Sequence, residues 1–254
     1  MVKVKMFESQ THVDREAMDM PALDADGFME VVESRRSVRV FAKDPVPEQV
    51  VDACIRAAQL APNSSNLQTW EIHHVQQEDK KAALVKACLG QPAASTAAEL
   101  FVFVARPDLW KRNNAWTLAE FERRGNMPER AHQYFKKITK IAYTQGLFAW
   151  VKAVWFPLRG LNKPTPREPI GWGDMKVWSQ KSTALAAAHF MLAMRAHGFD
   201  TCPMEGMDSR RIKTLLNLPS SAEINMVISA GKRTSKGVYG ERFRFPRDTF
   251  LHRH

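Results

Sequence analysis

The hydrophobic residues of this chain recur with two periods, one typical of helices and one typical of buried strands. Helical spacing predicts helices over residues 24–35, 45–61, 78–89, 174–198 and 209–217. Short apolar runs predict strands over residues 70–76, 99–106, 199–204 and 224–230. Because helices alternate with strands, we expect an α+β or α/β fold with a central mixed sheet and helices on both of its faces.

The domain boundaries follow from changes in this pattern. Residues 110–155 are helical in character but irregular, and residues 157–173 hold four prolines and three glycines, which predicts a loop. We therefore expect a single domain over residues 24–254 with a helical and loop insertion at about 110–173. Residues 1–23 show no clear period and are predicted to form an N-terminal arm that is ordered only against a partner subunit.

Composition and charge narrow the class of ligand. The chain has 254 residues, of which 44% are hydrophobic and 25% charged, which is typical of a globular protein. Its net charge is +10, and residues 232–254 contribute seven Lys or Arg against two Asp or Glu. A basic tail suits nucleic acid or a phosphorylated small molecule. No known nucleic-acid-binding signature accompanies it, which favours the small molecule and no nucleic-acid partner.

Missing motifs exclude several other classes. The three cysteines, Cys54, Cys88 and Cys202, are widely spaced, and the chain has neither C-x-x-C nor H-E-x-x-H, so no metal site is expected. Reduced cysteines and no visible signal peptide favour a cytoplasmic protein. The longest apolar stretch, 182–194, is too short to span a bilayer, so no membrane partner is expected. The chain lacks G-x-G-x-x-G, so a Rossmann domain that would bind a nicotinamide dinucleotide is not expected.

Two basic segments are candidates for binding a phosphate. The first is Arg35-Arg36-Ser37-Val38-Arg39, which combines cations with a small hydroxyl at a helix end. The second follows the last predicted strand, where Arg242 and Arg244 alternate with Phe243 and Phe245. On an extended strand, the arginines would share one face. The alternatives are a solvated helix end and an amphipathic edge strand.

Two polar turns are candidates for contacting a ring. The loop 61–70 carries small hydroxyl and amide side chains, which also suit the satisfaction of turn backbone. The turn after residue 202 ends in Glu205-Gly206, where glycine permits close approach of the backbone to a ligand; alternatively, Gly206 only forms the turn. Gln91 follows Gly90 and adds one further amide.

In this order, the four segments resemble the nitroreductase family of FMN-dependent oxidoreductases. The family patterns are Arg-(Arg or His)-Ser-x-(Arg or Lys)-x-Phe, Ala-Pro-Ser-x-x-Asn-x-Gln-Pro-Trp, Pro-(Ile or Met)-x-Gly and (Lys or Arg)-x-Arg-x-Pro. The chain departs from them where Asn63 replaces Ser and Thr69 replaces Pro. The cofactor-binding residues that the resemblance implies are Arg35, Arg36, Ser37, Arg39, Pro62, Asn63, Ser64, Asn66, Gln68, Gln91, Pro203, Met204, Glu205, Gly206, Arg242 and Arg244.

The resemblance also implies a function. It implies a homodimer in which the loop 62–68 contacts the tightly bound FMN of the other subunit. NAD(P)H would deliver hydride to flavin N5 in a ping-pong reaction that reduces nitroaromatic or quinone acceptors, without a catalytic side chain. The basic surface favours NADPH over NADH.

The aromatic insertion is predicted to cover the flavin, with Trp155 and Trp172 as substrate-binding residues. The alternative is that its aromatic residues build the dimer core. Alternative functions are enone reduction, reductive dehalogenation or flavin fragmentation on the same fold, or a basic nucleic-acid-binding or non-catalytic flavin-binding protein.

Overall fold

The central element of the computed structural model, which describes residues 21–125 and 128–254, is a four-stranded sheet. Its strands, in the spatial order β1-β2-β4-β3, are Trp70–Val75, Glu99–Ala105, Glu223–Gly231 and Asp200–Met204. These strands pair antiparallel throughout, and an isolated parallel bridge joins Ser37 to Thr201. The α+β class is confirmed, and in the described residues the parallel part of the expected mixed sheet is limited to that bridge.

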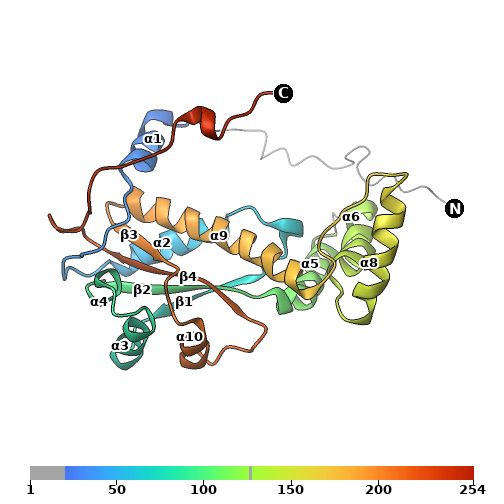
Figure 1. The fold of residues 1–254 in the computed structure, drawn as a ribbon, viewed down its shortest axis with the longest axis horizontal. Helices are drawn as coiled ribbons and strands as arrows, with labels where there is room; N and C mark the ends of the chain where they lie inside the picture. The colour runs from blue at the N-terminus through green and yellow to red at the C-terminus, as the bar shows by residue number, and fades with distance from the viewer. Residues whose placement is uncertain (1–20, 126–127) are drawn as a thin grey trace.

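Helices cover both faces of the sheet, as predicted (Figure 1). One face packs against α2 and the long α9, and the other against α3, α4 and α10. The alternation along β2 explains this, because Phe101 and Phe103 point to the α9 side while Val102 and Val104 point to the other side. The bounds of these helices are Glu48–Gln59, Trp172–Ala196, Glu78–Ala87, Pro92–Ser95 and Ser209–Leu215.

The first helix, α1, leads the chain into the basic segment. It covers Ala25–Ser34, and the Asp24 carboxylate caps it by accepting a bond from Gly27 N at 2.9 Å. Its apolar side is not buried, since Phe28 and Met29 are 57% and 47% exposed. Residues 1–20 of the predicted arm lie outside the described residues.

The insertion forms a helical extension at one end of the molecule (Figure 1). Its elements are α5 (Trp110–Arg124), α6 (Glu129–Gln133), a π-helical turn (Tyr134–Ile138), α7 (Thr139–Tyr143) and α8 (Leu147–Gly160). Part of the predicted loop 157–173 is wrong. Pro157 lies inside α8, and α9 begins at Trp172 because the Asp174 carboxylate accepts bonds from Ile170 N and Gly171 N, at 2.8 and 3.1 Å.

The alternative of an amphipathic edge strand at residues 242–245 is not what the structure shows. The segment has no regular secondary structure, because no neighbouring strand in the described chain offers it a ladder of hydrogen bonds. The ring centroids of Phe243 and Phe245 lie 5.2 Å apart, and Phe243 lines the same pocket as Arg242 and Arg244.

Within residues 21–125 and 128–254, no helix has both the length and the apolar character needed to cross a bilayer. No group of three His, Cys, Asp or Glu side chains in these residues comes together in a way that suits a metal ion.

Candidate functional site

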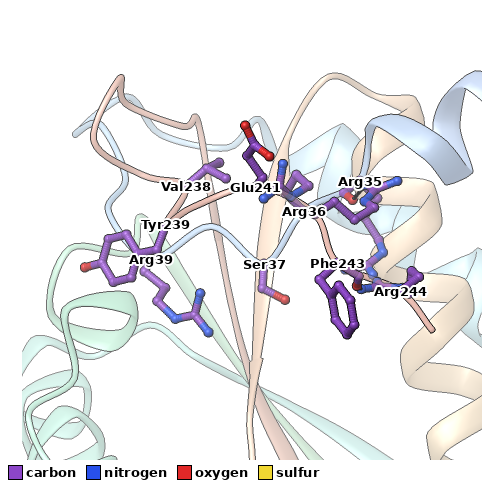
Figure 2. Close-up of a pocket in the computed structure, with 10 residues that line it drawn as sticks. Arg35, Arg36, Ser37, Arg39, Val238, Tyr239, Glu241, Phe243 and Arg244 are labelled. Atoms are coloured by element: carbon purple, nitrogen blue, oxygen red, sulfur yellow. Dashed lines mark hydrogen bonds between the residues drawn. The ribbon is translucent and has the colours of Figure 1, made fainter.

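The two basic segments, which are about 200 residues apart in the sequence, line one pocket of about 200 Å³ (Figure 2). Arg242 Nη2 donates to Arg35 O at 2.5 Å, and Arg36 Nη2 donates to Gly240 O at 2.9 Å. Figure 2 shows Ser37 between Arg35 and Arg244 on one side and Arg39 on the other. The predicted residues at this pocket are Arg35, Arg36, Ser37, Arg39, Arg242 and Arg244.

The charge of this pocket is not neutralised within the described chain. None of the arginines that line it forms an ion pair with a carboxylate there, although Glu241 also lines the pocket. Burial, followed by the nearby charges of Arg242 and Arg244, lowers the pKa of Arg35. Because the arginines repel one another, a bound anion would stabilise the cluster through charge-assisted hydrogen bonds.

A buried ionic network holds the first basic segment in place. The Asp200 carboxylate, 2% exposed, accepts bonds from Arg195 Nη1 at 3.1 Å and Arg233 Nε at 2.7 Å. Arg195 and Arg233 also bind the side chain and the carbonyl of Ser34, the last residue of α1. This network was not predicted from the sequence. The sign of it in the sequence is Asp200, a carboxylate at the start of an apolar strand, which needs a cationic partner when buried.

The turn after β3 lies close to the same pocket. Val38 N donates to Thr201 O at 3.0 Å, which ties the first basic segment to β3. Burial raises the pKa of Cys202, and the nearby charges of Arg39 and Arg35 offset part of this rise. Gln91 Nε2 donates to Gly206 O at 2.8 Å, so Gln91 supports the turn. The Met204 side chain is buried in the core, which leaves only its backbone for a ligand.

A side chain added at Gly206 would enter open space beside the turn. A Cβ added there would meet no atom closer than Gln91 Nε2 at 3.7 Å, an ordinary contact. We therefore expect Gly206→Ala to leave the unfolding midpoint of the cofactor-free protein unchanged while it weakens FMN binding by roughly tenfold, since glycine is needed only for ligand approach. Fluorescence titration with FMN measures this. Glu205→Gln is the matched control, and equal affinities of wild type and Gly206→Ala would contradict the prediction.

The polar loop 62–68 does not meet this pocket within one chain. It enters β1 at Trp70, which pairs with Ala105, and Ala105 pairs in turn with Glu223. Ser37 instead bridges Thr201, which pairs with Ala230 at the other end of β4. Pro62, Asn63, Ser64, Asn66 and Gln68 therefore lie at the opposite end of the sheet from the arginines.

The loop has a strained backbone that its neighbours hold in place. Ser65, Asn66 and Gln68 have φ values of 55°, 49° and 45°, which non-glycine residues rarely adopt. Asn63 Oδ1 accepts from Gln68 N at 2.8 Å, so this replacement of the family serine caps the loop. Strain of this kind clusters at functional sites.

Two tyrosines of the insertion also hold this loop, and the sequence analysis missed them. The hydroxyls of Tyr134 and Tyr143 each lie 2.7 Å from Ser65 Oγ. Burial raises the pKa of Tyr143. Nothing in the sequence around Tyr134 and Tyr143 indicates which residues their hydroxyls contact.

The predicted substrate-binding tryptophans lie on two different helices, α8 and α9. Trp155 is on α8, half exposed, with Arg159 5.1 Å above its ring. Trp172 is the first residue of α9 and is 38% exposed. Both side chains are accessible to a ligand. Their helices place them toward the same end of the molecule, where the helical extension lies (Figure 1).

This α+β fold carries, at one edge of its sheet, a pocket of arginines without carboxylate partners in the described chain. Such a pocket suits an anionic ligand. The model of the nitroreductase family matches residues 32–232 of this chain. The chain belongs to the nitroreductase family and is an oxidoreductase.

Individual relatives match nearly the whole chain. The NADH dehydrogenase of Thermus thermophilus is 29% identical over 223 residues, which cover 88% of this chain and 93% of the relative. The 4-nitrobenzoate reductase of Pseudomonas putida is 29% identical over 236 residues, covering 89% and 94%. The crystal structure of a protein from Exiguobacterium sibiricum in complex with FMN has a TM-score of 0.68 at 21% identity, covering 92% of this chain and 99% of that one. This last likeness shows a shared fold.

Proposed function

We propose that this protein is an FMN-dependent NAD(P)H oxidoreductase that reduces nitroaromatic or quinone-type acceptors in ping-pong order. The uncompensated arginine pocket is the observation that carries the proposal. The cofactor's chemistry is acceptance of a hydride and return of the electron pair. The protein's part is to bind it, orient it and select what stacks on it.

The residues of the pocket fit a phosphorylated flavin. Arg35, Arg242 and Arg244 would bind the phosphate with Ser37, while Arg36 and Arg39 complete the cationic wall. The backbone from Pro203 to Gly206, with room above Gly206, would face the ring. Gln91 supports that turn.

The experiment that tests the function is a visible absorption spectrum before and after anaerobic NADPH. We expect a yellow protein whose flavin bands bleach when NADPH is added. A protein that stays colourless after reconstitution with FMN would overturn the proposal.

The net charge of +10 favours NADPH through its additional phosphate, and a comparison of kcat/KM for the two donors tests that preference. The three free, buried cysteines support a cytoplasmic location.

In a homodimer with shared active sites, the loop 62–68 of one subunit would complete the arginine pocket of the other. The loop 62–68 lies near the start of α9 and the arginines near its end, since Ser179 Oγ donates to Thr69 O and Arg195 Nε donates to Ser34 Oγ. Two copies with antiparallel α9 helices would bring the loop of one to the arginines of the other. The exposed apolar residues of α1 and the tail support such an interface.

Mixed dimers test the shared site. Arg35→Gln damages the pocket, and Asn66→Asp combined with Gln68→Glu damages the loop without changing side-chain size. If sites are shared, a mixed dimer has one intact site, so co-expression of the two inactive variants should restore about a quarter of wild-type activity. Each variant expressed alone is the control. No restoration in purified mixed dimers would place the whole site in one subunit.

The insertion is proposed to select the acceptor. Replacing Trp155 and Trp172 by Ala should lower kcat/KM for bulky nitroaromatic and quinone acceptors by roughly tenfold, because each loses an aromatic stacking surface. The rate of flavin reduction by NADPH should change little. Steady-state kinetics with a series of acceptors measures this, with Trp150→Ala, a 78% exposed tryptophan of the same helix as Trp155, as the control. An unchanged acceptor profile would favour a purely structural role.

A further inference from the structure

Helix α8 presents its apolar side outward. Leu147 and Trp150 are 92% and 78% exposed, and the other residues of the same side are also exposed. At 100° per residue, these positions fall on one face of the helix. We call this face the α8 stripe, and it consists of Leu147, Trp150, Val151, Val154, Leu158 and Leu161.

The inner side of α8 fixes which face points outward. Lys152 is 1% exposed and donates to Ala142 O at 2.8 Å and Pro169 O at 3.0 Å, and Phe156 is buried beside it. Rotating the helix to bury the stripe would break both bonds of a buried cation. The stripe therefore stays outside, although burial of its leucines would by itself be favourable.

Cations surround the C-terminal end of the stripe. Arg159, Lys163 and Arg167 form no ion pair within the part of the chain that the structure describes. The Arg167 guanidinium packs directly over Gly160, where an added Cβ would clash with it. Residues 110–173 hold twelve Lys or Arg and four Asp or Glu, a net charge of +8 out of +10.

We propose that α8 docks on the surface of a membrane that contains anionic lipids, with its axis in the plane of the interface. Tryptophan and leucine on one face with flanking Lys and Arg are the composition of interfacial helices. Each basic residue near an anionic surface strengthens binding about fivefold. The inference does not depend on the cofactor.

A lipid surface fits this face better than a second copy of the chain. An interface centred on the stripe would be isologous and would bring two sets of unpaired cations together, whereas anionic headgroups neutralise them. The expectation of no membrane partner rested on the length of apolar runs, which does not detect an amphipathic face.

Vesicle sedimentation of the full-length protein tests the proposal. We expect binding to vesicles of phosphatidylcholine mixed with phosphatidylglycerol, and at least roughly tenfold weaker binding to phosphatidylcholine alone. Trp150→Glu and Leu158→Glu should each reduce binding to the mixed vesicles by roughly tenfold. Leu60→Glu is the matched control, because Leu60 is a 74% exposed leucine outside the insertion, and it should bind like wild type.

Three results would overturn the proposal. The first is no binding to either kind of vesicle. The second is equal binding by wild type, Trp150→Glu and Leu158→Glu in samples whose circular dichroism confirms folding. The third is that Leu158→Glu converts a dimer to a monomer in light scattering without any change in vesicle binding, which would assign the stripe to a contact between copies.

Discussion

Arg35→Gln combined with Arg244→Gln is expected to weaken FMN binding by roughly 10²–10⁴-fold, because two charge-assisted hydrogen bonds are each worth about 1.5–3 kcal/mol. Both side chains line the pocket. The two arginines also repel each other, since the charge of Arg244 helps to lower the pKa of Arg35. The cofactor-free double variant should therefore be at least as stable as wild type. Loss of affinity without loss of stability is the signature of an anion site.

Fluorescence titration with FMN and thermal unfolding of the cofactor-free protein measure the two effects. The matched control is Arg247→Gln, which removes a charge three residues further along the same tail but outside the pocket. Its affinity should stay within about threefold of wild type, as expected for a screened surface charge. Equal losses in Arg247→Gln and the double variant would point to a general effect of net charge.

Asp200→Asn is expected to lower the free energy of unfolding of the cofactor-free protein by about 3 kcal/mol. Removing one partner of a buried ion pair costs about 3–5 kcal/mol, and the lower end applies because both arginines retain some contact with water. Their side chains are 25% and 36% exposed, whereas Asp200 is 2% exposed. Urea unfolding followed by circular dichroism gives the value.

The control for this variant is Asp44→Asn, because Asp44 is exposed and should change stability by less than about 0.5 kcal/mol. Since Arg195 and Arg233 also hold Ser34, Asp200→Asn should additionally weaken FMN binding through a displaced Arg35. If stability stays within about 0.5 kcal/mol of wild type, the network is not what positions the first basic segment.

The elements predicted best are those whose pattern is local. The capping aspartates at 24 and 208 and the apolar run of β2 depend on neighbours in sequence, so α1, α10 and the central strand lie where expected. The motifs were also visible locally, which is why the family could be named from them. Pro157 misled the loop assignment because α8 continues through it for a further three residues.

The tertiary structure alone decided which distant segments lie close together in space. It brought Arg242 to Arg35, placed the loop 62–68 at the other end of the sheet, and put Tyr134 and Tyr143 against Ser65. It also turned the apolar side of α8 outward through the buried Lys152. The sequence by itself determined the elements, the motifs and the family, because period and residue type are properties of short segments. Which segments share a pocket depends on chain folding and long-range packing, and no short segment encodes that.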